Sequence, residues 1–345
     1  MANPADEWSG ADLTGVARSG LINEDVMQAI WDISNVPLPF SDRCGTMSVG
    51  NSLHMWTQDS LPAADLTNAA VDGADLTAND AVGGTRVGNH CQISTKRVSV
   101  TTRARNSNTI GRADELAYQV SRRQIELRRD REAILLENQA SVADDGDTVA
   151  GKLGGMPTWY ATNTDFGATT GAVGGYNTAD GLTDVYTAGT TAAISEATIR
   201  DLVQNVYEQG GESQVLMSSP SIIRKISEYM FTDTAKIATL QSDQGRSRDP
   251  AAALGTVNFF ITDFGSLELV PNRLQAQVAA NDWEIHILDF QYLRLSFLHG
   301  YKTEPVAKTG LADKRIMSVD GSLAVLNEKA QALYADVLDN TAMVA

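Results

Sequence analysis

Histidine, cysteine and serine are the side chains with which this chain could form a metal site or a nucleophile. The histidines and cysteines do not recur at the spacing of a zinc site; they are His54, His90, His286, His299, Cys44 and Cys91. His90 and Cys91 are adjacent, so on a strand they would point to opposite faces. Met47-Ser48-Val49-Gly50 resembles half of a nucleophile elbow, but its leading glycine, Gly45, stands one residue too early. These residues predict a turn and two reduced thiols.

Two loops have the composition of ligand-binding loops without their order. Gly151-Lys152-Leu153-Gly154-Gly155 is rich in glycine, but a phosphate loop ends in Gly-Lys-Ser/Thr and enters a helix, whereas Met156-Pro157 follows here. Asp144-Asp145-Gly146-Asp147 lacks the alternating oxygens and the closing glutamate of a calcium loop, which favours a solvated turn. We therefore expect no catalytic, cofactor-binding or metal site, and we expect that the protein is not an enzyme.

The overall charge argues against a nucleic-acid-binding protein. The 345 residues include 27 basic and 43 acidic side chains, a formal net charge of −16. Phosphate binding needs clustered lysine and arginine, and a strongly acidic surface repels a duplex. The start of the chain lacks the pattern of a secretory signal, and no run is apolar enough to predict a membrane span. The length suggests about two domains.

The order of the charges is more informative than their sum. Residues 44–85 contain no basic residue and five aspartates, whereas residues 86–131 carry eleven basic and four acidic side chains, a balance of +7. The arginines could bind nucleic acid, or form a solvated face laced by i,i+4 pairs, or receive the acidic segment of a second copy. Because complementary charge fixes register and partner choice, we favour the last interpretation. The candidate subunit-interface residues are Asp59, Asp65, Asp72, Arg122, Arg123, Arg128, Arg129 and Arg131.

The first part of the chain predicts reaching elements rather than a compact domain. Residues 1–44 read as an arm with a short amphipathic helix over 24–34, and Pro37 and Pro39 force an extended path that ends near Phe40. We expect the arm to bury its apolar side chains in another subunit. Residues 45–110 predict two long strands, one at Leu53–Met55 and one over 93–102, joined by a polar tip as a protruding hairpin.

A long helix is predicted over residues 113–138. Leu116, Val120, Leu127 and Ile134 mark one apolar stripe, and Asp114 with Glu115 favours the positive end of the helix dipole. Residues 195–300 predict a mixed α/β region. It contains a helix capped at Ser195, a strand over 214–217, a helix starting at Ser219-Pro220, and strands over 257–262, 267–270, 284–288 and 293–298. A further long strand is predicted over 315–329, with a break or bulge at Gly321. The fold class is α+β.

Five segments carry a family resemblance in the same order along the chain. They are Arg112–Gln119 (RADELAYQ), Glu126–Glu132 (ELRRDRE), Ala150–Asn163 (AGKLGGMPTWYATN), Thr262–Gly265 (TDFG) with Leu269–Arg273 (LVPNR), and Ala307–Arg315 (AKTGLADKR). Together they resemble the major capsid proteins of tailed double-stranded DNA bacteriophages, in particular the podovirus type with an elongated head. The resemblance covers roughly residues 40–335.

The resemblance implies the Hong Kong 97-type capsid fold. Residues 1–44 would be its N-terminal arm and 45–110 its extended loop. Residues 111–194 would be the peripheral domain with the spine helix at 113–138. Residues 195–300 would be the axial domain, and 301–345 would return to the peripheral domain and the C-terminus.

The resemblance also implies a structural function. Family members self-assemble into hexamers and pentamers, first as a precursor shell that expands when DNA is packaged. The expected partners are other copies of the chain, a portal, a scaffolding protein and a decoration protein. The shell would enclose DNA without sequence-specific binding or contact with a membrane, in a virion assembled in the bacterial cytoplasm. A nanocompartment shell of the same fold is the alternative; a hydrolase or a nucleic-acid-binding protein has little residue support.

Overall fold

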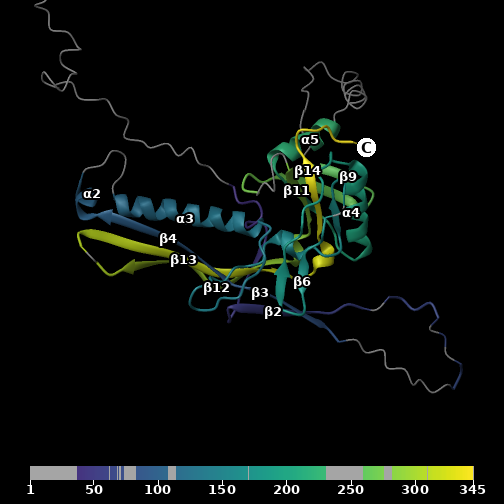
Figure 1. The fold of residues 1–345 in the computed structure, drawn as a ribbon, viewed down its shortest axis with the longest axis horizontal. Helices are drawn as coiled ribbons and strands as arrows, with labels where there is room; N and C mark the ends of the chain where they lie inside the picture. The colour runs from purple at the N-terminus through teal and green to yellow at the C-terminus, as the bar shows by residue number, and fades with distance from the viewer. Residues whose placement is uncertain are drawn as a thin grey trace, which may run out of the picture.

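The computed structural model describes residues 37–61, 63–67, 69, 71–73, 83–107, 114–169, 171–230, 259–275, 282–308 and 310–344. Two sheets carry the fold (Figure 1). One is a long sheet with a single helix lying along it, and the other is a shorter sheet with its own helices. The predicted helix over 24–34 lies outside the described residues.

The long sheet has four strands in the order β1-β12-β13-β4 among the described residues. These strands are β1 (Gly45–Ser48), β12 (Leu293–Val306), β13 (Ala312–Val325) and β4 (Gln92–Thr101). β13 runs antiparallel to both β12 and β4. Gly321 does not interrupt β13, which pairs with β4 from Ala312 to Gly321; the irregularity lies across the ladder in β12, on either side of His299.

Helix α3 (Glu115–Leu135) covers one face of this sheet, as the apolar stripe predicts. Asp114 caps it by accepting from the amide of Leu116 at 2.9 Å, which satisfies one of the open donors of the first turn. Leu116 and Leu127 are buried against Val98, Val100, Met317 and Val319 of the sheet. The helix is shorter than predicted because residues 136–138 already form the turn that follows it.

The second sheet has six strands in the order β5-β14-β11-β8-β10-β9. Their bounds are Thr164–Phe166, Ala332–Leu338, Asp282–Leu288, Val215–Ser218, Gly265–Pro271 and Phe259–Thr262. Helices α4 (Glu196–Glu208) and α5 (Pro220–Met230) pack on one face through residues such as Leu202 and Ile226. The other face packs on the end of α3 and on Phe40. The predicted caps Ser195 and Ser219-Pro220 stand where these helices begin.

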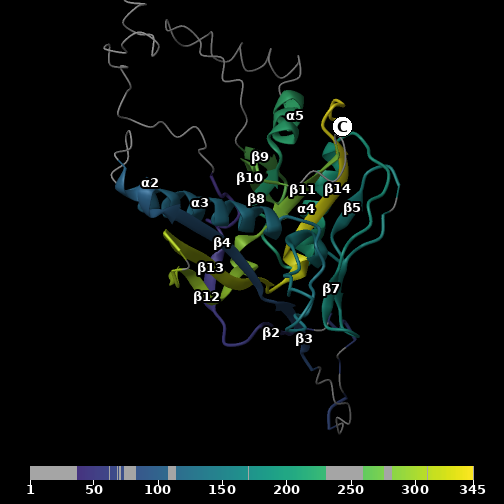
Figure 2. The same cartoon turned by 60° about the vertical axis from the view of Figure 1, so that its left-hand side comes forward.

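The hairpin differs from the prediction in its second strand. β2 (Leu53–Gln58) pairs antiparallel with β3 (Thr85–His90), not with the strand over 92–101. β1 and β4 belong to the four-stranded sheet, so the hairpin covers residues 53–90 rather than 45–110. In both views the chain that follows β2 leads away from the two sheets (Figures 1 and 2).

The boundary expected near residue 300 does not separate the two sheets. β12 starts at Leu293 and lies in the four-stranded sheet, whereas β14, within the segment expected to return to that part, is a central strand of the six-stranded sheet. β5, from the region before residue 195, is an edge strand of the same sheet. The chain therefore crosses between the two parts several times, and this gives them a shared core.

The remaining described elements connect these two parts. They are α2 (Thr102–Asn106), the ribbon of β6 (Gly175–Asn177) with β7 (Leu182–Asp184), and the single-turn helices η1 (Met156–Trp159), η2 (Phe290–Tyr292) and η3 (Glu328–Ala330). Within the described ranges, no helix has the length and apolarity required to cross a membrane.

Candidate subunit interface

The hairpin presents acidic and apolar side chains that its own subunit leaves uncovered. Asp59, Asp65 and Asp72 are exposed, and Leu61, Leu66 and Val71 are 96%, 97% and 80% exposed. Hydrogen bonds from the Thr67 hydroxyl and amide hold the pKa of Asp65 below its usual value, so this carboxylate stays charged. Exposed apolar residues grouped on one segment indicate a surface that contacts another protein.

The arginines of α3 are largely engaged within the subunit. Arg123 pairs with Glu126 one turn along the helix. Arg128 is exposed and lies over the Tyr301 ring, 5.4 Å from its centre, while Arg122 and Arg129 are half-buried. Four of the five predicted helix arginines are therefore exposed or half-exposed, although only part of their charge is available to a partner.

Arg131 lies inside the subunit, which contradicts its predicted place at a subunit contact. Its side chain is 2% exposed and stacks on the Phe297 ring at 5.3 Å. Gly321 leaves the space for it, since a Cβ there would lie 2.8 Å from Arg131 Nη2. Burial lowers the pKa of Arg131. The sequence did carry the signal, because Arg131 follows Leu127 by four residues and so falls on the same buried stripe.

The sheet face opposite α3 is a surface that the sequence interpretation missed. Residues of β4 that alternate with buried Val98 and Val100 are exposed, including Ile93 (60%) and Arg97. In the strand ladders, Ile316 of β13 lies opposite Arg97 of β4 and Glu304 of β12. Lys302 of β12 lies opposite Ser318 of β13, which in turn lies opposite Thr95 of β4. We call this surface the open face: Ile93, Thr95, Arg97, Ser99, Lys302, Glu304 and Ile316. Among described residues, Arg97 and Lys302 have no ion-pair partner.

The loops with ligand-like composition have structural explanations. Asp145 accepts from the amides of Asp147, Thr148 and Val149, and these hydrogen bonds lower its pKa to about 2. The glycines after Lys152 allow close packing, because a Cβ on Gly155 would lie 2.0 Å from Glu137 O.

The residues considered for metal or nucleophilic chemistry lie in ordinary structural positions. Ser48 ends β1 in a parallel ladder with β12. Cys91 is buried, with its pKa raised to about 11 by burial first and Asp320 second. In the part of the chain that is described, no three histidine, cysteine or carboxylate side chains are grouped as a metal site.

The profile of the SU10 major capsid protein family matches residues 9–338. The chain belongs to this family. A curated relative, the major capsid protein of Escherichia phage Phieco32, is 27% identical over 209 residues, which cover 53% of this chain and 59% of that protein. The match thus spans less than two thirds of the relative's length.

Solved structures share the fold at low identity. A chain of the Microbacterium phage Oxtober96 structure is 12% identical with a TM-score of 0.56 over 95% of this chain and 98% of that one. A chain of the Gordonia phage Cozz structure is 12% identical with a TM-score of 0.55 over 99% of this chain and 97% of that one. The SrpI encapsulin of Synechococcus elongatus PCC 7942 is 12% identical with a TM-score of 0.55 over 95% of this chain and 97% of that one. The chain therefore has the Hong Kong 97-type shell fold, as the resemblance implied.

Proposed function

We propose that this member of the SU10 family is the major structural subunit of a phage head. In this proposal it assembles into hexamers and pentamers that enclose double-stranded DNA, within a virion built in the bacterial cytoplasm. The family match over residues 9–338 carries the proposal. A portal, a scaffolding protein and a decoration protein are the further partners that this function implies. Weak adhesion between an acidic wall and DNA suits packaging and release, because like charges repel.

The first experiment tests assembly itself. The full chain is purified and its sedimentation and negative-stain images are recorded at rising concentration, alone and with a candidate scaffolding protein. Shells, tubes or capsomer rings support the proposal. Compact monomers at every concentration, with and without the scaffolding protein, contradict it.

A compartment shell that encloses an enzyme is the second candidate, since an encapsulin shares the fold. The contents of shells formed in cells separate the two. Packaged DNA in the presence of portal and terminase supports the phage head, whereas one co-purifying enzyme in every shell supports the compartment.

Within the head, the acidic hairpin of one copy contacts a basic surface of the next. Two surfaces compete for it: the outer side of α3 with Arg122, Arg123, Arg128 and Arg129, and the open face on the other side of the sheet. The open face is favoured because Arg97 and Lys302 have no ion-pair partner in the described part of the subunit, while Arg123 and Arg128 already have contacts. The exposed Ile93 and Ile316 there suit the apolar hairpin residues.

Charge reversal distinguishes the two surfaces. We expect Arg97→Glu with Lys302→Glu to block assembly and leave the subunit folded, and Asp59→Lys with Asp65→Lys to restore it in part when the two proteins are mixed. Arg273→Glu with Lys329→Glu is a control that changes the same charge at exposed positions of the other part. If Arg128→Glu with Arg129→Glu blocks assembly and the open-face variant does not, the hairpin binds α3.

A further inference from the structure

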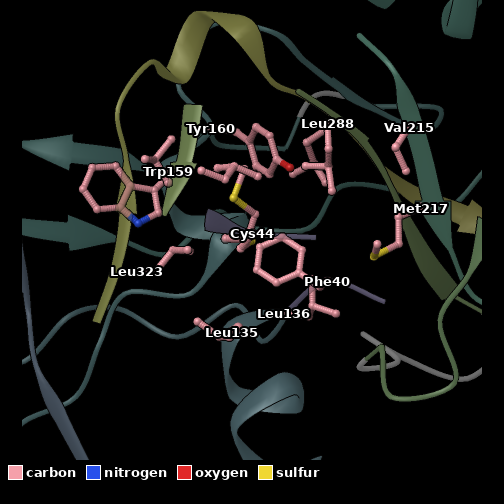
Figure 3. Close-up of a cluster of buried hydrophobic side chains, with 14 of the residues drawn as sticks. Phe40, Cys44, Leu135, Leu136, Trp159, Tyr160, Val215, Met217, Leu288 and Leu323 are labelled. Atoms are coloured by element: carbon pink, nitrogen blue, oxygen red, sulfur yellow. The ribbon is translucent and has the colours of Figure 1, made fainter. Parts of the chain in front are cut away.

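The chain enters the folded body through a short turn that is buried in this same subunit. The amide of Asp42 donates to Leu38 O at 3.0 Å, and that of Cys44 to Phe40 O at 3.1 Å. The Phe40 ring is fully buried beside Leu135 at the end of α3, Leu136 in the turn after it, and Met217 of β8 (Figure 3). This corrects the expectation that the apolar residues of segment 1–44 are all covered by another subunit. We call residues 38–44 the arm root.

A buried carboxylate holds the backbone of the arm root. Glu132 on α3 is 0% exposed, and its Oε1 accepts from the Phe40 amide at 2.8 Å. Its Oε2 accepts from the Ser41 amide at 2.8 Å and from the Ser41 hydroxyl. No cation among the described residues pairs with this carboxylate. Since a polar group is costly to bury without hydrogen-bond partners, the arm root supplies most of the donors that this buried carboxyl group needs.

The same carboxylate also contacts the six-stranded sheet. Asn272, directly after β10, donates from Nδ2 to Glu132 Oε1 at 3.0 Å and is 1% exposed. Its own backbone amide donates to Ser218 O at 2.8 Å, so its position is fixed by β8. A second contact between the arm root and this sheet lies at the surface, where the Arg43 guanidinium donates two 2.7 Å hydrogen bonds to the Glu268 carboxylate of β10. Arm root, α3 and six-stranded sheet therefore meet at one residue.

We propose that Glu132 is a positioning residue for the N-terminal arm. By holding Phe40 and Ser41 against α3 and Asn272, it fixes the position and backbone course of residues 38–44, where the arm joins the folded body. This inference rests on the proposed shell function. It follows that α3 cannot turn against the six-stranded sheet without breaking the Glu132–Asn272 contact or moving the arm root, so the position of the arm root depends on the relative position of α3 and that sheet.

The test compares Glu132→Gln with wild type in the full chain. Glutamine keeps the shape of the side chain but replaces one acceptor oxygen by an NH2 donor. That donor would face another donor, either a backbone amide of the arm root or Asn272 Nδ2, so at least one hydrogen bond is lost. In the unassembled subunit we expect hydrogen exchange at the amides of Phe40 and Ser41 to become about tenfold faster or more, because these two amides lose or weaken their hydrogen bonds to the carboxylate. Exchange in α4 and β11 should stay unchanged. Glu137→Gln, exposed just after the same helix, is the matched control.

Assembly gives the second measurement. Glu132→Gln should form fewer closed shells than wild type and more irregular ones, while Glu137→Gln assembles normally. Unchanged exchange at the amides of Phe40 and Ser41, or normal shells from a variant in which these amides exchange fast, overturns the positioning role. If wild type itself forms no shell, the proposed function fails, yet the exchange result still decides whether Glu132 holds the arm root.

A milder variant keeps the test decisive if Glu132→Gln does not fold. Ser41→Ala removes only the hydroxyl donor to Glu132 Oε2. We expect a smaller acceleration confined to the same amides, and a smaller fall in closed shells. Acceleration spread evenly over α3 and the six-stranded sheet would instead mean that the contact only stabilises the core.

Discussion

The six-stranded sheet is covered on both faces, whereas the four-stranded sheet is covered on one. All four residues of β8 and the first six of β14 are buried, by α4 and α5 on one side and by the shared core on the other. β4 alternates between exposed and covered residues, because only α3 lies on it. The inner strands of the first part are thus covered within one chain. The second offers a long, ordered surface to another molecule, as expected of a shell subunit.

The largest expected effect tests the covered face of the four-stranded sheet. Leu127 is 1% exposed between α3 and the sheet, so Leu127→Asp should cost about 4 kcal/mol or more through lost apolar burial and an unpaired buried carboxylate. Urea unfolding followed by circular dichroism measures it. Ile125→Asp on the same helix, where the side chain is 46% exposed, should change stability by less than about 0.5 kcal/mol. A Leu127→Asp protein with the wild-type midpoint would contradict this packing.

Elements with local signals were predictable from the sequence. The α3 stripe and the caps at Ser195 and Ser219 depend on neighbours within one or two turns, so the sequence places them. The sequence did not predict β3 because its residue types are determined by close contacts with distant backbone groups and not by an alternating apolar pattern. A Cβ on Gly88 would lie 2.9 Å from His54 O, and buried Asn89 donates to Leu323 O at 2.8 Å. Such contact partners are distant in the sequence and produce no periodic pattern of residue types within the strand.

The candidate interface was only partly predictable for a related reason. The order of charged residues along the chain pointed to the acidic hairpin, and its described aspartates Asp59, Asp65 and Asp72 are exposed. The same counting placed Arg131 among the arginines of a subunit contact, although its side chain is buried inside the subunit. Net charge does not tell which side of a helix a residue occupies; for Arg131, the spacing of four residues from Leu127 does.

A second prediction concerns the buried cation between α3 and the four-stranded sheet. The Nε, Nη1 and Nη2 atoms of Arg131 have no hydrogen-bond partner within the described residues. We expect Arg131→Met to stabilise the subunit by about 1–2 kcal/mol, since an apolar side chain of similar length avoids the cost of desolvation, and the lost stacking on Phe297 offsets part of the gain.

Chemical denaturation of Arg131→Met and of Arg123→Met measures this effect. Arg123 pairs with Glu126 at the surface, and its loss should change stability by less than about 0.5 kcal/mol. If Arg131→Met is instead destabilised by more than about 1 kcal/mol, the guanidinium holds β12 and β13 together through its contact with Phe297.

A third prediction tests the covered sheet through pH. Asp282 on β11 is 3% exposed, and its pKa is raised from 3.8 to about 6 by burial first, then by Asp336 and Glu284. Burial first, and then Glu284, also raises the pKa of Asp336, against the hydrogen bond from the Gly189 amide, which lowers it. A carboxyl whose pKa is raised by folding binds its proton more tightly in the native state. Its contribution to stability is therefore complete below about pH 4 and is lost as the pH rises through about 6.

Asp282→Asn should remove this part of the pH dependence and stabilise the subunit at pH 8 more than at pH 4. Thermal unfolding across that range measures the difference, with Asp147→Asn, at an exposed turn, as the control that leaves the profile unchanged. Because Asp282 lies on an inner strand that is covered within one chain, the profile should be the same in unassembled subunits and in shells. A profile that changes on assembly would mean that a neighbouring copy reaches this sheet as well, which would erase the contrast between the two parts.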